Sequence, residues 1–366
     1  MFLIFLSIFL AFAYFFLVSH FVSGWKHLPE ELLLDKSCEL FISVVIAFRD
    51  EEKVLPQLLE RIATQTHQAF ELILVNDHST DNSLQTIAAF SDLEEKVHLV
   101  EAIGTGKKNA LKEGIVKAKG KLIVCTDADC LPTENWIKSI AQFQERENCD
   151  LIICPVRMSF GDSFFSKMQT LEFTSLITTG AGAAASKTPV LCNGANLAFT
   201  PKVWQESLGD LKEKETSGDD MFLMMSVKKR GGKIRFLKST AAIVETASCE
   251  TLSDFFNQRK RWASKSKSYR DFQVIVLALL VFGICSAMVA SLVVGFFNPI
   301  FWKAVVFLFL LKILTDISLL MASAKFFSTE KLLIYIPFLE IIYPFYVVGT
   351  ALSGLFGKFS WKGRTN

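Results

Sequence analysis

The sequence predicts an α/β domain with a mostly parallel, Rossmann-like sheet, joined to α-helical membrane segments. Three observations carry this prediction. Between residues 40 and 245, short β-branched apolar runs alternate with stretches of helical period. Long apolar stretches stand at both ends of the chain. Polar clusters directly follow several of the apolar runs, which is where open parallel sheets bind ligands.

The middle of the chain alternates four expected strands with three expected helices. We expect strands at residues 42–48, 70–75, 96–102 and 121–126, and helices at 51–66, 83–90 and 109–118. Short connections of this kind place helices on both faces of the sheet. Polar residues follow three of the strands: Arg49-Asp50-Glu51, Asn76-Asp77 and Asp127-Ala128-Asp129.

Four apolar segments are long enough to cross a bilayer. Residues 2–18 carry no charge, and no basic start or small-residue cleavage site accompanies them. We therefore expect an uncleaved anchor rather than a signal peptide. Residues 272–297, 304–324 and 332–356 form three further segments. Their charged residues, Lys312, Asp316 and Glu340, either line a cavity or pair with one another.

These features divide the chain into five expected parts. They are an anchor (1–23), a catalytic domain (24–249), an amphipathic interfacial helix (250–271), three membrane segments (272–356) and a tail (357–366). The basic flank from Arg259 to Arg270 places the middle domain on the cytoplasmic face of an inner or plasma membrane. Basic residues after the last segment point the other way, and a re-entrant last segment is the alternative.

Composition excludes several classes of function. The formal net charge of +2 gives no reason to expect a nucleic-acid partner. The eight cysteines contain no C-x-x-C pair, which argues against a zinc site or a disulfide framework and favours a reducing compartment.

Two acidic clusters carry the strongest chemical signal. Asp127 and Asp129 end an expected strand, and both could reach one divalent metal and its bound diphosphate. A turn-forming pair before Pro132 is the structural alternative. Downstream, Asp219 and Asp220 begin an expected helix. They offer a general base, or they only complement the helix dipole.

Three further motifs add to these clusters. Asp77 and the residues after it can contact a nucleotide or cap a helix. Lys107 lies at an expected helix start, where a cation can pair with a diphosphate, although the Walker A spacing is absent. Gln258-Arg-Lys-Arg-Trp262 lies on an amphipathic stretch. It either rests on anionic headgroups, or places Arg261 on a pyrophosphate and Trp262 beside a sugar.

In this order, the motifs resemble the family 2 glycosyltransferases, and most of all the membrane-embedded branch of cellulose, hyaluronan and chitin synthases and ceramide glucosyltransferase. The resemblance covers residues 40–265 and extends to the flanking spans. It implies a GT-A fold, a nucleotide-sugar donor and Mg²⁺ or Mn²⁺. One departure is Asn76-Asp77, where the family often has two adjacent Asp.

The resemblance also implies a role for individual residues. Donor contacts would come from Ala47, Glu51, Asp77, Lys107, Asp127, Gln258, Arg261 and Trp262. The metal would be held by Asp129 and Asp127. Asp220 would be the catalytic base, with Asp219 where the family often has Glu. The acceptor side would be formed by Asn193, Gly194, Asn196 and Trp262.

We therefore expect an inverting glycosyltransferase that moves a sugar, from a UDP-sugar in the first instance, to a lipid or lipid-linked acceptor in cell-envelope polysaccharide or glycolipid synthesis. The expected partners are the nucleotide sugar, the lipid or glycan acceptor and membrane lipids. A processive polysaccharide synthase is the first alternative. A catalytically silent sugar-nucleotide-binding subunit, and a small transporter, are alternatives of other classes.

Overall fold

The computed structural model describes residues 2–90, 93, 95–211, 218–356, 360–361 and 364–365. The chain divides into two compact units. The sheet unit comprises Leu28–Ser159 and Cys192–Ala247, and the helical unit comprises Met1–His27, Phe160–Leu191 and Ser248–Asn366. Each unit is continuous in space but not in sequence.

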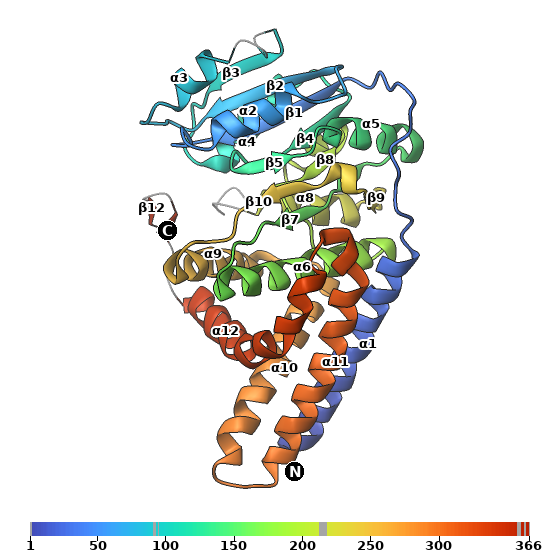
Figure 1. Ribbon diagram of the computed structural model, residues 1–366, viewed down its shortest axis with the longest axis vertical. Coiled ribbons are helices and arrows are strands. Elements are labelled where there is room, and N and C mark those ends of the chain that lie inside the picture. Colours follow the sequence, from blue (N-terminus) through green and yellow to red (C-terminus); the bar gives the residue numbers. More distant parts are fainter. Residues whose placement is uncertain are drawn as a thin grey trace. The chain divides into compact units, whose positions relative to one another are not determined.

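The sheet unit is built on a seven-stranded sheet with the order β3-β2-β1-β4-β8-β6-β9 (Figure 1). Among these strands, β8 alone runs antiparallel to its neighbours, β4 and β6. The other pairs are parallel. The strands are β1 (Ile42–Phe48), β2 (Phe70–Asn76), β3 (Val97–Glu101), β4 (Leu122–Cys125), β6 (Leu151–Ile153), β8 (Leu197–Phe199) and β9 (Ile234–Phe236).

The central strands are buried on both faces, which is why they read as continuous apolar runs rather than alternating ones. Every residue of β1, β2 and β4 is buried. The predicted mostly parallel α/β architecture is therefore confirmed, and the four predicted strands are present with ends that differ by one residue at most.

Short helices and a second sheet complete this unit. The helices are α2 (Leu55–Ala63), α3 (Ser83–Ala88), α4 (Lys107–Lys117), α5 (Trp136–Glu147), α7 (Pro201–Ser207), α8 (Asp219–Lys229) and the 3₁₀ turn η2 (Thr240–Ala242). The second sheet has the order β5-β10-β7, formed by Cys130–Pro132, Val244–Thr246 and Val156–Met158.

Gly114 lets α4 lie directly on the main sheet. A Cβ at this position would come within 2.7 Å of methyl groups of both Val45 and Val75. Because β1 and β2 are rigid and buried, this close contact fixes α4 against the sheet and sets where its first residues point.

The helical unit contains the long apolar helices. Four helices in the described part of the chain are long and apolar enough to cross a membrane: Leu3–His27, Phe272–Gly295, Phe301–Phe327 and Glu330–Gly354. The helices of this unit are α1 (Phe2–His27), α6 (Phe164–Ala185), α9 (Leu252–Ser264), η3 (Lys265–Ser268), α10 (Phe272–Gly295), α11 (Phe301–Phe327), η4 (Glu330–Tyr335) and α12 (Ile336–Phe356).

Helix α6 was not predicted from the sequence. It lies inside the expected 24–249 domain, yet its contacts group it with the helical unit. Gly24 of α1 and Gly182 of α6 meet where these helices cross, because a Cβ on either glycine would collide with a backbone carbonyl of the other helix. The short strands β11 (Ser360–Trp361) and β12 (Arg364–Thr365) follow α12, and the rest of the expected 357–366 tail lies outside the described residues.

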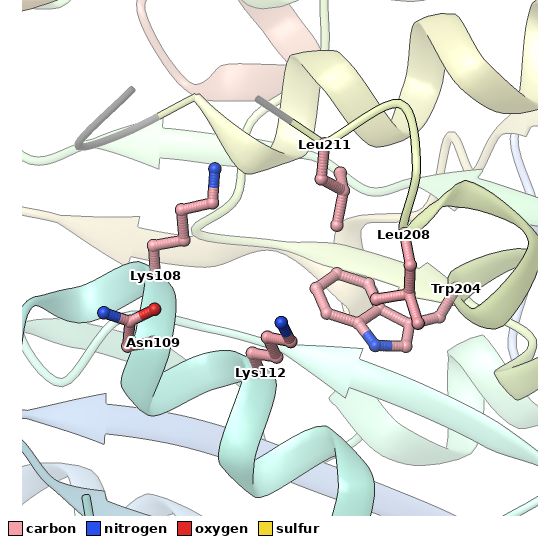
Figure 2. A pocket seen from close by; sticks show the side chains of 6 residues that line it. All are labelled: Lys108, Asn109, Lys112, Trp204, Leu208 and Leu211. Carbon is pink, nitrogen blue, oxygen red and sulfur yellow. The ribbon is translucent and has the colours of Figure 1, made fainter. Parts of the chain in front are cut away.

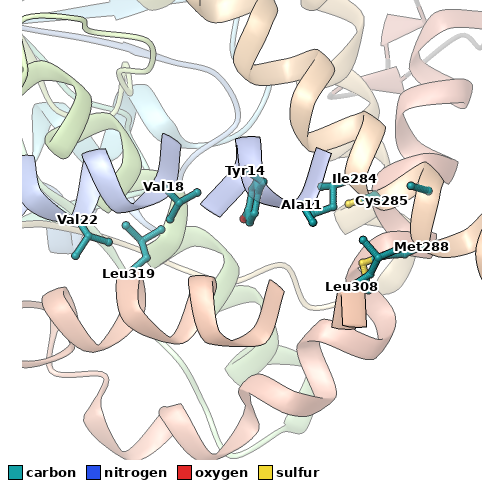
Figure 3. Packing of buried hydrophobic residues seen from close by; sticks show 10 residues of the cluster. Ala11, Tyr14, Val18, Val22, Ile284, Cys285, Met288, Leu308 and Leu319 are labelled. Carbon is teal, nitrogen blue, oxygen red and sulfur yellow. The ribbon is translucent and has the colours of Figure 1, made fainter. Parts of the chain in front are cut away.

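The core of this unit combines apolar packing with paired charges. Figure 3 shows side chains of α1, α10 and α11 packing together, among them Tyr14, Cys285 and Leu308. Lys312 is 1% exposed and pairs with both Asp316 and Glu340. The hydroxyl of Tyr14 donates to Asp316 at 2.5 Å. The predicted pairing of Lys312 with Asp316 is confirmed, and it links α1, α11 and α12.

Helix α9 is anchored by a second buried ion pair. The guanidinium of Arg259 is 3% exposed and bonds both carboxylate oxygens of Glu172 on α6. The hydroxyl of Tyr346 on α12 donates to the same carboxylate at 2.6 Å. The rings of Phe255 and Trp262 cover the guanidinium, at 4.5 and 4.2 Å from their centroids. An arginine next to the predicted Gln258, Arg261 and Trp262 thus fixes the helix that carries them.

Candidate active site

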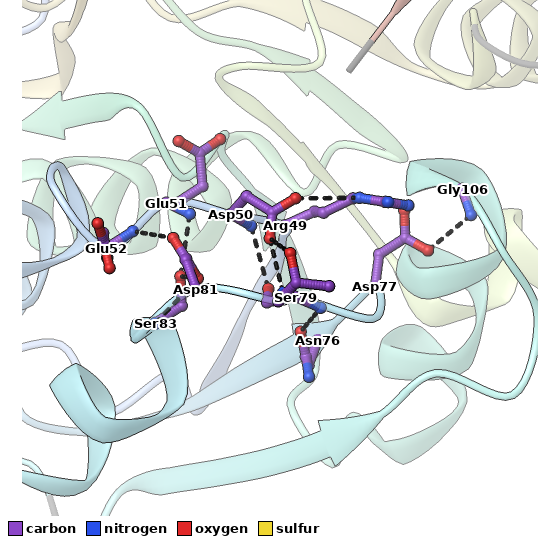
Figure 4. Close-up of polar contacts among 11 residues, drawn as sticks. Arg49, Asp50, Glu51, Glu52, Asn76, Asp77, Ser79, Asp81, Ser83 and Gly106 are labelled. Carbon is purple, nitrogen blue, oxygen red and sulfur yellow. Dashed lines mark hydrogen bonds and ion pairs between the residues drawn. The ribbon is translucent and has the colours of Figure 1, made fainter. Parts of the chain in front are cut away.

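The loops that follow β1 and β2 are bonded to each other (Figure 4). The backbone N–H groups of Asp50, Glu51 and Glu52 donate to the side chains of Ser79, Ser83 and Asp81, at 3.1, 2.9 and 2.9 Å. In return, the backbone N–H of Thr80 donates to the Asp50 carboxylate at 2.7 Å. That bond lowers the pKa of Asp50 below its ordinary value. These hydrogen bonds therefore hold the two polar loops together at this edge of the sheet.

Asp77 holds the loop that precedes α4. The residue is 1% exposed, and its carboxylate accepts the backbone N–H of Gly106 at 2.7 Å. Gly106 has φ = 96°, a conformation that favours glycine. Glu113 of α4 accepts the N–H groups of Ile103 and Gly104 at 2.8 and 2.9 Å, and these bonds lower the pKa of its carboxyl. The start of α4 is thus held from both sides.

Two lysines at the start of α4 pair with the two acidic clusters. Lys107 bonds the carboxylate of Asp127, which follows β4. The ammonium of Lys108 lies 3.1 Å from the carboxylate of Asp219, and both side chains are about 15% exposed or less. Clusters that are far apart in sequence therefore meet at one helix N-terminus, whose own partial positive charge also favours carboxylates.

Asp127, Asp129 and Cys130 form a group whose possible ligand atoms lie within 4.8 Å of one another. Many protein atoms surround the Asp129 carboxyl, and this burial and the nearby Asp127 charge raise its pKa. Part of the residue is nevertheless exposed to solvent. Burial and the charges of both aspartates raise the pKa of the Cys130 thiol, and its sulfur is a softer donor than a carboxylate oxygen. The remaining donors are carboxylate oxygens, which fit Mg²⁺ or Mn²⁺.

Asp219 and Asp220 are the first two residues of α8, and they point to different partners. Gly218 precedes them with φ = 99°. While Asp219 faces Lys108, the carboxylate of Asp220 accepts the N–H of Gly194 at 2.9 Å and that of Met221 at 2.8 Å. Each carboxylate oxygen has two acceptor positions, so these bonds orient Asp220 and leave it able to accept a proton.

The predicted acceptor-side segment, residues 193–196, lies between Asp220 and the sheet. Gly194 contacts Asp220 through its backbone. Asn196 is fully buried, and it bonds Trp136, Pro155 and Ala242 with its side chain. This residue can shape the acceptor side only through the loop that it holds. Thr126 ties the loop to the end of β4 by donating to the Ala195 carbonyl at 2.8 Å.

The structure brings most of the predicted site residues of the sheet unit to one edge. Ala47 is buried near the end of β1, and Glu51 lies in the loop after it. Gln258, Arg261 and Trp262 belong to the helical unit, so their predicted contacts with the donor and acceptor stay a prediction. Within that unit, Gln258 accepts a bond from Arg259, and Trp262 packs on the same guanidinium.

Sequence reasoning missed two residues that shape this site. Lys108 was not singled out, and Glu113 was only one residue of the helix expected at 109–118. A signal for Glu113 was present, because an acidic residue two helical turns after a glycine-rich loop can reach back to that loop's free N–H groups. No sequence signal distinguished Lys107 from Lys108.

A family comparison agrees with this geometry. Residues 43–204 match the model described as "Glycosyl transferase family 2". The chain carries a family 2 glycosyltransferase domain. The family predicted from the motifs is therefore confirmed for residues 43–204.

Two curated relatives align with parts of this chain. The chain is 33% identical over 148 residues to an undecaprenyl-phosphate 4-deoxy-4-formamido-L-arabinose transferase of Proteus mirabilis, an alignment that covers 38% of this chain and 44% of the relative. It is 24% identical over 228 residues to a poly-beta-1,6-N-acetyl-D-glucosamine synthase of Staphylococcus aureus, covering 61% and 53%. The chain thus spans about half the length of each relative.

A solved structure shares the fold over nearly its full length. It is a mannosyltransferase of Pyrobaculum calidifontis in complex with GDP-Man and Mn²⁺, with a TM-score of 0.58 and 16% identity. The match covers 97% of this chain and 99% of that one. The predicted GT-A fold is confirmed by this likeness.

The structure explains why position 76 is asparagine. Asn76 is 3% exposed, and its side-chain amide both accepts and donates a hydrogen bond. Its oxygen accepts the N–H of Ser79 at 2.9 Å, while its nitrogen donates to the carboxylate of Glu101 at 2.8 Å. An aspartate here would keep the first bond and place two carboxylates against each other at the second.

We therefore predict that Asn76→Asp destabilises the protein by about 1–3 kcal/mol, because a donor is lost and a buried carboxylate faces Glu101. Thermal unfolding of the full chain in detergent measures this as a lower midpoint. Adding Glu101→Gln should restore most of the loss, since glutamine supplies a donor to the new aspartate. An unchanged midpoint for Asn76→Asp would show that the Glu101 contact contributes nothing.

Proposed function

We propose that this chain is a membrane-embedded enzyme that transfers a sugar from a nucleotide sugar to a lipid or lipid-linked acceptor. The observation that carries the proposal is the meeting of both acidic clusters at the start of α4. The cluster of Asp127 and Asp129 offers oxygens that could bind a metal, and Asp220 offers an oriented base. Sugar transfer from a nucleotide sugar uses a metal and a base close together.

The donor half of the site is assigned to the residues after β1, β2 and β4. Asp77 and the loop at Glu51 would receive the nucleoside, and Lys107 the diphosphate. Asp127 and Asp129 would hold Mg²⁺ or Mn²⁺, which supplies charge neutralisation for the departing diphosphate. A protein of the same fold was solved with GDP-Man and Mn²⁺. UDP is our first choice of nucleotide for this chain.

Asp220 is assigned as the general base. Bonds from Gly194 and Met221 orient its carboxylate, and the ion pair with Lys108 holds its neighbour Asp219 elsewhere. Asp220 would take the proton of an acceptor hydroxyl as that oxygen attacks the anomeric carbon and the diphosphate leaves from the opposite face. One displacement of this kind inverts the configuration at that carbon. Gln258, Arg261 and Trp262 would cover the diphosphate and the acceptor sugar.

The acceptor is proposed to be a lipid or lipid-linked molecule, bound at the cytoplasmic face. The relative from Proteus mirabilis is named for undecaprenyl phosphate. The charges inside the helical unit are paired with one another, with Lys312 bonded to Asp316 and Glu340, rather than spread along a path for a polymer. The domain limits predicted from the sequence, including the anchor at 1–23, form part of this proposal.

A processive polysaccharide synthase is the second candidate. The observation in its favour is the longer alignment with a poly-beta-1,6-N-acetyl-D-glucosamine synthase, over 61% of this chain. Product size separates the two candidates, because a processive enzyme makes long chains from the first turnovers. A catalytically silent subunit would bind a nucleotide sugar without turning it over.

We predict that purified full chain in detergent releases nucleoside diphosphate from one member of a panel of UDP-, GDP- and dTDP-sugars. A membrane lipid extract would serve as acceptor. Release should require Mn²⁺ or Mg²⁺, should stop with EDTA, and should fall by at least about 10²-fold in Asp129→Ala. No release from any donor would contradict the enzyme and favour the silent subunit.

We also predict unequal effects of the two neighbouring aspartates. Asp220→Asn should lower kcat by about 10²-fold or more with little change in donor binding, because it removes a proton acceptor. Asp219→Asn should change donor or acceptor affinity more than kcat, since it breaks the pair with Lys108. Activity that survives Asp220→Asn would rule this residue out as the base.

A further inference from the structure

A cavity of about 250 Å³ opens beside α4, on the sheet unit alone. Its walls are two lysines and an asparagine of α4 on one side, and the end of α7 with the residues after it on the other. Figure 2 shows Lys108 and Lys112 extending from α4 on the side that faces Trp204, Leu208 and Leu211. The residues assigned to the donor half of the site take no part in lining it.

Among the described residues that line the cavity, the charged ones are two lysines, and both lie on α4. Lys108 and Lys112 are one helical turn apart, so they share a face of α4. Lys112 is exposed, and no carboxylate of the described residues lies within 4.0 Å of its ammonium. Lys108 connects the cavity to the candidate base, because it pairs at 3.1 Å with Asp219, the neighbour of Asp220.

The opposite wall is apolar. Trp204 is 6% exposed and stacks on Phe199 with 5.7 Å between ring centroids. Leu208 is 42% exposed, so its apolar surface is open to a ligand. The Nε1 donor of Trp204 is buried without an acceptor among the described residues. The stacked Trp204 ring and the exposed Leu208 side chain therefore give the cavity an apolar side.

Through Lys108, the cavity is connected to the base cluster rather than to the metal-binding cluster. Successive helical residues are rotated by about 100°, so Lys107 and Lys108 leave α4 in different directions. Lys107 pairs with Asp127 of the metal-binding cluster, and Lys108 pairs with Asp219 of the base cluster. The Lys108 side of α4 is therefore linked to the base cluster, where the proposed function places the acceptor hydroxyl.

We propose that this cavity is a subsite for a phosphate group carried by the acceptor, with the apolar wall taking the acceptor's adjoining ring or chain. Lys108 and Lys112 bind the phosphate, and Trp204 and Leu208 pack on the body next to it. This inference rests on the proposed function and specifies it: the acceptor is a phosphorylated molecule, and a phosphate-free glycan or lipid binds poorly.

The test is binding of radiolabelled farnesyl phosphate and of farnesol to the full chain in detergent. Wild-type protein should bind the phosphate at least about tenfold more tightly than the alcohol, because charge-assisted contacts are lost with the phosphate. Lys112→Gln should weaken farnesyl phosphate binding by roughly tenfold. Lys117→Gln, at the end of the same helix and outside the cavity, should leave it unchanged.

Leu208 supplies a second, matched pair of variants. Leu208→Asp places a negative charge in the cavity and should weaken farnesyl phosphate binding by roughly tenfold. The neutral Leu208→Asn should change it less than threefold. Since Leu208 is 42% exposed, neither change threatens folding. Equal binding of farnesyl phosphate and farnesol, no binding of either, or insensitivity to both Lys112→Gln and Leu208→Asp would overturn the proposal.

Two further measurements distinguish the acceptor subsite from phosphate binding at the donor position and from the proposed transferase activity. UDP should not compete with farnesyl phosphate, and competition would assign the bound phosphate to the donor position and overturn the subsite. Nucleoside diphosphate release is measured on the same preparations. Release without the predicted binding pattern refutes the subsite alone, whereas the binding pattern without release supports the subsite and refutes the proposed activity.

Discussion

The candidate site depends on the pairing of two adjacent lysines with two separate acidic clusters. Asp127, Asp129, Asp219 and Asp220 gather around the start of α4, where Lys107 and Lys108 oppose them. Four carboxylates outnumber these two ammonium groups, and burial together with the Asp127 charge raises the pKa of the Asp129 carboxyl. A surplus of carboxylates is compatible with the divalent cation that the proposed function assigns to Asp127 and Asp129.

The rest of the sheet unit keeps α4 in place. Gly114 allows it to lie on β1 and β2, Asp77 and Glu113 hold the loop before it, and the bonded loops after β1 and β2 support that loop. In the helical unit, buried ion pairs also hold elements together. Arg259 pairs with Glu172, and Lys312 pairs with Asp316 and Glu340. Removing one partner of such a pair leaves an uncompensated buried charge, which is why these residues constrain the fold strongly.

Much of the fold was predictable because buried parallel strands and membrane segments leave strong patterns in the sequence. The strand ends, and the acidic clusters that follow them, were placed correctly for that reason. Helix α6 was missed because its small residues, such as Gly180 and Gly182, are chosen for close contact with neighbouring backbone and give no helical period. The partners of Lys108, Glu113 and Arg259 were missed because pairing between distant segments is decided by packing, which one sequence does not display.

The most direct test is a double-mutant cycle on Lys108→Gln and Asp219→Asn, with kcat/KM for nucleoside diphosphate release as the readout. If α4 joins the two acidic clusters through this pair, the double variant should lose little more than either single variant, with a coupling of about 1 kcal/mol or more. Effects that simply multiply would mean that Lys108 and Asp219 act independently, and would contradict the joining of the two clusters through α4.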